Sequence, residues 1–232
     1  MTGKAAIAAV VAARMSSRRL PGKVIKPLMG RPMLAWLLDR LEHCHALDGL
    51  CVATSEQASD DPIATFCMSR GVVCYRGELD NVAARILGAA TTLKADAVVR
   101  ISGDSPFMDG SLVASLVELY RRESPDLASN VVVRSFPKGQ SVEVLNVESL
   151  RRELPRFDGK DDNEHVTPYF YRNAGRLRIA ALQQDANHSA IQLSVDSKED
   201  FDRAARLIGR FTRPHWTYRA SELVDMLAEE AE

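Results

Sequence analysis

The sequence lacks several features that would assign it to a familiar class. Its four cysteines form no C-x-x-C pair, so the usual spacing of zinc and redox sites is missing. We therefore expect free, buried thiols in a cytoplasmic, reducing environment. No apolar run approaches the ~20 residues that a membrane helix requires. No internal repeat is visible, and His43-Cys44-His45 is no metal site, because neighbours on a helix point in different directions.

A large net charge is also missing. The formal charge of −1 over 232 residues argues against a general nucleic-acid or membrane binder, so we expect neither partner. The charge is unevenly spread, however. Residues 1–45 contain eight lysines and arginines against two acids, a net +6, which leaves −7 for the rest of the chain. This asymmetry predicts a local positive site on a nearly neutral protein.

Short apolar runs alternate with segments of helical periodicity in the first half of the chain. Strands are expected at 5–11, 49–55, 72–75 and 96–101, and helices at 33–44, 61–71, 80–93 and 110–122. Gly71 can end the second of these helices, and Asp109 can cap the fourth. The βαβα order predicts an α/β fold with a mostly parallel sheet that is covered on both faces. Residues 1–13 imitate a secretory signal, but their core is Ala-rich and arginines follow at once, so we expect a buried strand.

The second half of the chain has a different character. Strands are expected at 127–133, 141–146, 177–183 and 190–195, separated by shorter helices, which indicates some antiparallel pairing. Two further helices are expected at 197–211, with Ser197 as the cap, and at 220–230. We expect a single domain over 1–232, with a small mixed-sheet lobe built from the region around 130–190.

The loop "AARMSSRRLPGK" (12–23) follows the first expected strand. In open α/β sheets, ligands bind beyond the carboxyl ends of the strands. A loop there with free backbone N–H groups, two hydroxyls and four cations suits a phosphate-rich ligand. The cations are Arg14, Arg18, Arg19 and Lys23. The loop matches neither the Walker P-loop nor the G-x-G-x-x-G pattern, and a solvated basic loop is the alternative interpretation.

Two acids follow apolar strands at equivalent places. Asp104 comes after "VVRISG", and Asp196 comes after "IQLSV" and directly before a helix. Two carboxylates beside a cationic loop are typical of a Mg²⁺–polyphosphate site, since Mg²⁺ takes one or two carboxylates, waters and phosphate oxygens. The alternative is that Asp196 caps the helix and Asp104 forms a turn. Glu143, Glu164 and His165 are candidates for an acceptor pocket, although a lone histidine is more often structural.

These motifs carry a family resemblance. The stretch "AARMSSRRLPGKVIKPLMGRPML" resembles the N-terminal signature of the cytidylyltransferases that make CMP-activated acid sugars. It is most similar to the spore-coat-polysaccharide type within the acylneuraminate and CMP-Kdo synthetase superfamily. The resemblance continues in order through "VATSEQASDDPI", "YRGELDNVAARI", "VVRISGDSPFMDG", "FPKGQSVEVL", "NEHVTPYFY" and "LSVDSKEDF", and so covers nearly the whole chain.

The resemblance implies a Rossmann-like nucleotide-diphospho-sugar transferase fold of the GT-A-like type. It also implies a homodimer, CTP and Mg²⁺ as ligands, an acidic-sugar acceptor and a role in polysaccharide biosynthesis. The implied catalytic residues are Arg14, Arg19 and Lys23, and the implied metal ligands are Asp104 and Asp196. The implied nucleotide-binding residues are Ala13, Arg14, Met15, Ser16, Ser17, Arg19, Lys23, Arg76, Ser102, Gly103 and Asp104. The implied acceptor-binding residues are Gln140, Ser141, Glu143, Glu164 and His165.

Three positions depart from the family pattern. Asn81, Ala84 and Ser141 stand where acids are usual, which points to an altered sugar or a non-sugar acceptor. Two other classes of function stay open. A glycosyltransferase that uses a finished nucleotide-sugar generally carries a D-x-D metal motif, which is absent here. A relative that binds nucleotide without turnover is the third hypothesis.

Overall fold

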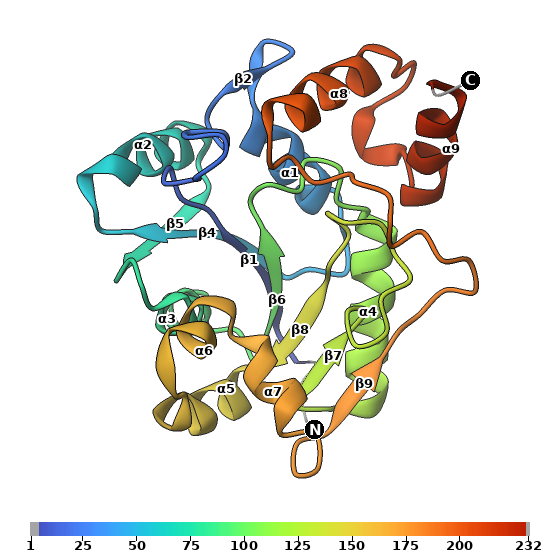
Figure 1. Ribbon diagram of the computed structural model, residues 1–232. Coiled ribbons are helices and arrows are strands. Elements are labelled where there is room, and N and C mark those ends of the chain that lie inside the picture. The colour runs from blue at the N-terminus through green and yellow to red at the C-terminus, as the bar shows by residue number, and fades with distance from the viewer. Residues whose placement is uncertain (1–4, 231–232) are drawn as a thin grey trace.

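Strand β1 (Ile7–Ala12) lies inside the main sheet with a strand on each side, as its apolar sequence predicts. It pairs in parallel with β4 (Gly49–Ser55) on one side and β6 (Ala97–Ser102) on the other, and β5 (Val73–Gly77) continues the sheet beyond β4. The computed structural model describes residues 5–230 (Figure 1). The first half of the chain therefore forms the parallel α/β arrangement that was predicted.

The other half of the sheet is mixed. Strand β8 (Glu143–Asn146) runs antiparallel to both β6 and β7 (Leu127–Ser129), whereas β9 (Ile179–Ala181) runs parallel to β7. The full order is β5-β4-β1-β6-β8-β7-β9, and a two-stranded sheet joins β2 (Pro27–Leu28) to β3 (Arg31–Pro32). The antiparallel pairing expected in the second half is confirmed, and it extends the main sheet.

Two strand predictions for this region need correction. Segment 190–195 forms no strand and makes only one isolated bridge, between Lys138 and Gln192. The N–H groups of Leu193 and Ser194 both donate to the Lys138 carbonyl, at 2.8 and 3.0 Å, so the segment pairs with a loop. Gly139 permits this approach, since a Cβ there would lie 2.5 Å from the Ser194 nitrogen. The predicted strand 127–133 ends at Ser129, beyond which the chain turns into an exposed loop.

Helices cover both faces of the sheet (Figure 1). They are α1 (Met33–Glu42), α2 (Asp61–Arg70), α3 (Val82–Thr92), α4 (Gly110–Glu123), α5 (Val147–Glu153), α6 (Gly159–His165), α7 (Thr167–Arg172), α8 (Lys198–Gly209) and α9 (Ala220–Glu230). Short 3-10 helices span Ala58–Asp60, Leu154–Arg156 and His215–Thr217. The predicted helix ends are confirmed: Gly71 is left-handed after α2, Asp109 caps α4, and Ser197 caps α8 in a reciprocal capping box with Asp200.

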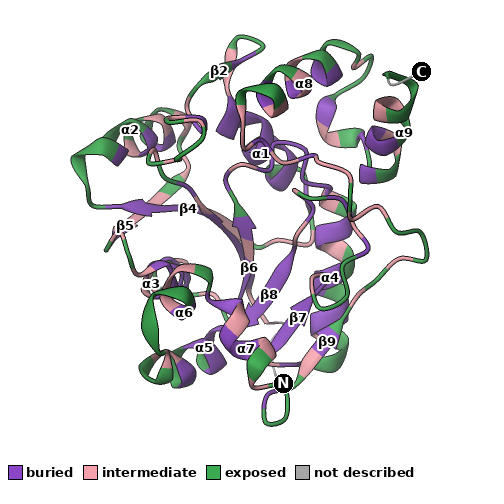
Figure 2. Cartoon of the chain, viewed as in Figure 1, coloured by how far each residue is buried: buried purple, intermediate pink, exposed green. Residues whose placement is uncertain are grey.

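The core divides into two apolar clusters, one on each face of the sheet. One contains Leu37 of α1 and Leu116 of α4, and the other contains Ile86 of α3 and Phe170 of α7. The inner strands and inner helix faces are buried, whereas the edge strands β5 and β9 are partly exposed and the outer helix faces are exposed (Figure 2). Among the described helices, none is long and apolar enough to span a bilayer.

Candidate nucleotide-binding site

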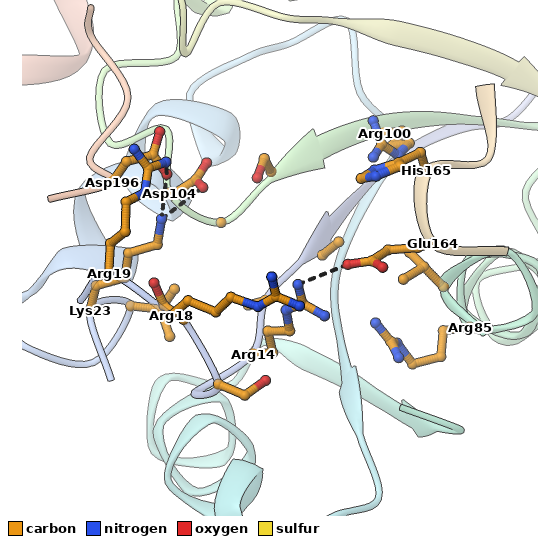
Figure 3. A pocket seen from close by; sticks show the side chains of 18 residues that line it. Arg14, Arg18, Arg19, Lys23, Arg85, Arg100, Asp104, Glu164, His165 and Asp196 are labelled. Atoms are coloured by element: carbon orange, nitrogen blue, oxygen red, sulfur yellow. Dashed lines mark hydrogen bonds and ion pairs between the residues drawn. The ribbon is translucent and has the colours of Figure 1, made fainter. Parts of the chain in front are cut away.

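A cavity of about 580 Å³ opens where β1 and β6 end, which is the place that the parallel sheet predicts for a ligand (Figure 3). Its wall comes from the loop after β1, the loop after β6, the start of α3, the end of α6 and the segment before α8. The lining residues are Ala12, Ala13, Arg14, Ser16, Ser17, Arg18, Arg19, Lys23, Val24, Val82, Arg85, Arg100, Ser102, Gly103, Asp104, Glu164, His165 and Asp196.

The loop after β1 is held in shape by hydrogen bonds at Met15. The Met15 carbonyl accepts from the N–H groups of Ser17 and Gly22, both at 2.9 Å. The Met15 N–H donates to Asp60 Oδ1 at 2.7 Å, and the other oxygen of Asp60 accepts from Ser55. Asp60 is buried and does not line the cavity, so this acid supports the loop from the protein interior. It is a positioning residue that the sequence motifs do not reveal.

Lys23 joins Asp104, which follows β6, to Asp196, which follows the segment 190–195 that forms no strand. Its buried ammonium donates to Asp104 Oδ2 at 2.9 Å, to Asp196 Oδ1 at 3.1 Å and to the Val195 carbonyl at 2.7 Å. Arg19 reaches the same oxygen of Asp196 at 3.2 Å. Residues that lie more than 170 positions apart in the chain therefore meet at one point. The alternative role of Asp196 as a helix cap is wrong, because Ser197 caps α8.

Gly103 allows the ends of β1 and β6 to close together. A Cβ at this position would lie 3.0 Å from both the Ala12 carbonyl oxygen and the Ala13 Cβ. The Gly103 N–H donates to that same Ala12 carbonyl at 2.8 Å. Asp104 is thereby fixed at the rim of β1, within reach of Lys23.

Arg14 crosses the cavity to α6. Its guanidinium donates to Glu164 at 3.0 Å, and both side chains are partly exposed (Figure 3). The hydrogen bond from Arg14 lowers the pKa of Glu164 below its ordinary value. His165 lines the cavity beside Glu164, and the next residue, Val166, is buried with φ of +67°. A β-branched residue in that region is strained, and such strain is concentrated at functional sites.

Asp104 and Asp196 are the residues that fit a metal ion. Their carboxylates already share one cation, the Lys23 ammonium, so oxygen atoms from both face a common point. Within residues 5–230, no three His, Cys, Asp or Glu side chains converge. This donor set does not resemble a zinc site, and it suits a hard cation that takes further oxygens from phosphate and water.

Five residues predicted for the site lie outside the cavity lining. They are Met15, Arg76, Gln140, Ser141 and Glu143. Arg76 donates to the carbonyls of Ser55 and Gln57 at 2.9 and 3.0 Å. The buried Gln140 amide bridges the Phe107 carbonyl and the N–H of Asp109 at 2.7 and 2.9 Å. These two side chains brace the strand ends from outside the cavity, and direct contact of the five residues with a ligand stays a prediction.

Two further arginines line the cavity, Arg85 of α3 and Arg100 of β6. The family resemblance implies that the region 76–85 helps to shape the base and phosphate pocket, whereas no motif assigns a role to Arg100. Arg85 of α3 is 2 % exposed and donates to the carbonyls of Glu78 and Leu79. No carboxylate of the described residues lies within ion-pair distance of it, and burial lowers its pKa, with the nearby charge of Arg14 adding to the effect. Arg100 interrupts the apolar sequence "AVVRI" of β6. A lone arginine in a buried strand was the available signal.

Comparison with known proteins agrees with this geometry. The family model for cytidylyltransferases matches residues 8–228. Spore coat polysaccharide biosynthesis protein SpsF of Bacillus subtilis is 30 % identical, covering 94 % of this chain and 92 % of that protein. An uncharacterized protein of Methanocaldococcus jannaschii, MJ1063, is 32 % identical over 84 % of this chain and 80 % of its own.

Solved structures give the same picture. A cytidylyltransferase from Leptospira borgpetersenii superposes with a TM-score of 0.90 at 25 % identity, covering 97 % of this chain and 94 % of that one. A CMP:2-keto-3-deoxy-manno-octonic acid synthetase complexed with CTP superposes at 0.68, with 18 % identity over 88 % of this chain and 99 % of that one, and so shares the fold. With the family model matching almost its full length, the chain belongs to the cytidylyltransferase family.

Proposed function

We propose that this protein transfers CMP from CTP to a hydroxyl group of an acidic sugar and releases pyrophosphate. The observation that carries the proposal is Lys23, buried between Asp104 and Asp196 on the wall of a cavity rich in arginine. Membership of the cytidylyltransferase family supports a nucleotidyl transfer. Similarity to a spore coat polysaccharide biosynthesis protein supports a sugar acceptor.

The side chains around the cavity account for the chemistry. The acceptor hydroxyl attacks the α-phosphorus, the new P–O bond forms, and the bond to the bridging oxygen of the leaving pyrophosphate breaks, while the hydroxyl proton passes to water. Arg19 and Lys23 stabilise the negative charge that develops on the phosphate oxygens, and the loop after β1 orients the nucleotide through its N–H groups. Most of the acceleration then comes from positioning and from charge stabilisation.

Asp104 and Asp196 would hold Mg²⁺ in this scheme. The ion would supply charge neutralisation on the triphosphate when it is bound. Lys23 and Arg19 already contact these carboxylates, so a metal and a triphosphate together replace ion pairs within the protein by ion pairs with the ligand. The negative charges of Asp104 and Asp196 would therefore stay neutralised by a cation after the exchange.

We propose further that the chain acts as one domain and as a homodimer in the cytoplasm. The region around 130–190, which supplies β8, β9 and helices α5 to α7, is the proposed acceptor and dimer lobe. Light scattering on the purified protein tests the dimer, because a monomer at micromolar concentration contradicts it.

The first test is nucleotide binding. We expect the melting temperature to rise more with CTP and Mg²⁺ than with ATP, GTP or UTP, since a ligand that binds only the folded state stabilises it. A shift with ATP or GTP but none with CTP contradicts the proposal. Chelation with EDTA should reduce the CTP shift if Asp104 and Asp196 hold a metal.

The second test is the identity of the product. Incubation of CTP with a panel of ulosonic and nonulosonic acids should release pyrophosphate. Release of CMP or UDP from a nucleotide-sugar would instead identify a glycosyltransferase. CTP binding with no product across the panel would identify a nucleotide-binding relative without turnover.

A further inference from the structure

Arg100 is a charged residue inside a buried strand, and the proposed chemistry at the phosphates makes no use of it. Its neighbours Val99 and Ile101 are fully buried, whereas its own side chain is 22 % exposed and lines the cavity. Alternation along β6 places Arg100 on the same face as Val98, under α3 and α7. In Figure 3 it lies with His165 on the side of the cavity away from Asp104 and Asp196.

A buried carboxylate holds one edge of the Arg100 guanidinium. Glu143 stands opposite Arg100 in the antiparallel pair β6–β8, and Nη1 of Arg100 donates to its Oε2 at 2.7 Å. The other oxygen of Glu143 accepts from the Tyr171 hydroxyl at 2.6 Å. Glu143 is 3 % exposed and is not among the residues that line the cavity.

The tyrosine is fixed in turn by the next strand. The Ser129 hydroxyl lies 2.7 Å from the Tyr171 hydroxyl, and the N–H of Val131 donates to Ser129 at 2.9 Å. The Ser129 hydroxyl therefore accepts from the Val131 N–H and donates to the Tyr171 hydroxyl, which in turn donates to Glu143. Burial and the Glu143 charge together raise the pKa of Tyr171, so it stays a donor. The network leaves Arg100 one fixed orientation.

Within residues 5–230, no side chain or carbonyl accepts from the remaining donors of Arg100. A guanidinium has five N–H donors, and Nη1 to Glu143 is the hydrogen bond that Arg100 makes within the described residues. Its Nε is buried without a partner. A buried ion pair adds little stability by itself, and an orphaned buried donor costs free energy. A positioned guanidinium with free donors at a cavity is the arrangement that binds planar anions in two-point contact.

Two of the other cavity cations, Arg19 and Lys23, lie at Asp104 and Asp196, whereas Arg14 and Arg85 lie toward Glu164 (Figure 3). Arg19 and Lys23 pair with Asp196, at the position proposed for the triphosphate. Arg100 lies on the opposite side, next to the end of α6 that carries Glu164 and His165 (Figure 3). An anion bound at Arg100 therefore belongs to the second substrate.

We propose that Arg100 binds the anionic group of the acceptor, a carboxylate or a phosphate, and that Glu143 and Tyr171 are positioning residues behind it. This inference rests on the proposed function and deepens it, because it names the acceptor chemistry that the cavity selects. Glu143, which the sequence placed in the acceptor pocket, then acts through Arg100 and touches no substrate.

The experiment compares Arg100→Lys with the wild type in steady-state pyrophosphate release. Lysine keeps the charge opposite Glu143, so the fold is preserved, but it loses the two-point contact. The carboxylate probes are 3-deoxy-manno-octulosonate and N-acetylneuraminate, each with its carboxamide, and the phosphate probes are mannose 6-phosphate and glycerol 3-phosphate. We expect a rise of about 10- to 100-fold in acceptor KM, with CTP KM unchanged.

Two further variants separate a binding role from a structural one. Arg100→Met combined with Glu143→Gln removes both charges together, so no unpaired charge is buried, and it should lose the preference for carboxylate over carboxamide. Tyr171→Phe should reduce that preference by a few-fold while leaving CTP KM unchanged. Arg122→Ala, an exposed arginine at the end of α4 that pairs with Glu123 alone, is the matched control.

The outcomes are distinct. An acceptor KM that stays constant in Arg100→Lys, or a CTP KM that rises equally, overturns the inference while CMP transfer itself stands. Turnover of the carboxamides at the rate of the acids also overturns it. A protein that binds CTP and turns over no probe, or that neither binds CTP nor releases pyrophosphate, contradicts the proposed function instead.

Discussion

Two clusters of ionic side chains, built from the same residue types, behave differently in this protein. The cavity cluster consists of Arg19, Lys23, Asp104 and Asp196, and the α1 cluster consists of Arg31, Asp39, Arg70 and His215. In the cavity cluster, the carboxyl side chains of Asp104 and Asp196 stay 24 % and 27 % exposed. These acids can exchange a protein cation for a ligand.

The α1 cluster is closed. Asp39 accepts from Arg31 at 2.6 Å, from His215 at 2.9 Å and from Arg70, so both of its oxygens are occupied. Although burial alone would raise the pKa of Asp39, these hydrogen bonds hold it well below its usual range. His215 packs edge-on against Trp36, with ring centroids 4.6 Å apart. The cluster joins α1 to α2 and to the segment before α9, and its acid, Asp39, is only 12 % exposed.

The two clusters differ in the exposure of their acids and not in the number of their ion pairs. Partly exposed acids can bind a ligand, whereas a buried, fully paired acid stabilises the fold. This difference predicts that the two clusters fail in different ways when one charge is removed. Loss of charge in the cavity should affect turnover, and loss of charge at Asp39 should affect folding.

The largest effect is expected for Lys23→Met. The substitution removes the ammonium that contacts Asp104 and Asp196 and that we propose stabilises the α-phosphate. Removal of one such donor costs roughly 10²–10³ in kcat, and here the metal ligands are disturbed as well. We expect kcat for pyrophosphate release to fall by about 10³-fold or more. Asp196→Asn should give a loss of the same order, and wild-type turnover in either variant contradicts the assignment.

Asp39→Asn tests the closed cluster. Breaking a buried ion pair by removing one partner typically costs about 3–5 kcal/mol. We expect the free energy of unfolding to drop by about 3 kcal/mol, at the lower end because Arg70 keeps its bond to Glu42. Urea denaturation measures the loss. The kcat of the folded protein at low temperature should stay at the wild-type value, and a specific loss of kcat would place Asp39 in the site.

These two clusters also show what the sequence can predict. The basic loop, Asp104, Asp196 and the Ser197 cap follow from local rules: a strand end, a turn and a capping pattern. The structure brings Asp104 and Asp196 to Lys23, but only Asp104 follows a strand of the sheet, since the segment before Asp196 forms no strand. The excess of charge in residues 1–45 was less informative, because it combines two separate groups of cations.

The charge count was a poor guide to the site because some of the cations serve the packing of α1 and do not line the cavity. Arg31 binds Asp39, and the buried Arg40 donates to the Tyr218 carbonyl at 3.0 Å, so both belong to the packing of α1. The role of Arg100 was hidden for a related reason, since it depends on the register of β6 against β8. The strand expected at 190–195 failed because its backbone bonds go to Lys138 in a loop. Local patterns carry no information on such long-range pairings.

Asp60→Asn is expected to have an intermediate effect. Asp60 is a buried structural acid, but its loss should affect turnover because it supports the cavity loop through the Met15 N–H. An amide offers one acceptor oxygen where the carboxylate uses two, so one set of bonds is lost. We expect kcat/KM for CTP to fall by about 10-fold, equivalent to about 1.4 kcal/mol. Asp202→Asn, an exposed acid paired with Lys198 on α8, is the control, and an equal loss there contradicts a specific role for Asp60.

The smallest effect is expected for Glu164→Gln, which removes the acid partner of Arg14 at the cavity. The Arg14–Glu164 pair is partly exposed, and exposed pairs contribute about 0–1 kcal/mol. Stability should therefore change by less than about 1 kcal/mol. Arg14 is released for the nucleotide, so the CTP affinity at pH 7 should rise by about 2- to 5-fold, as measured by calorimetry. Glu148→Gln on α5, a largely exposed acid outside the cavity, should leave the affinity unchanged.

The effect of Glu164→Gln on the CTP affinity should depend on pH in a direction that the pKa of Glu164 determines. Arg14 lowers the folded-state pKa of Glu164, so the ion pair is fully present above the unfolded value of 4.5 and is lost as the pH falls through the lowered pKa. Protonation of Glu164 in the wild type frees Arg14 in the same way as the glutamine does. The difference in CTP affinity between variant and wild type should therefore shrink as the pH falls below 4.5. A variant that binds CTP more weakly than the wild type at pH 7 would show instead that Glu164 supports the nucleotide, and that Arg14 needs its acid partner to be held in place.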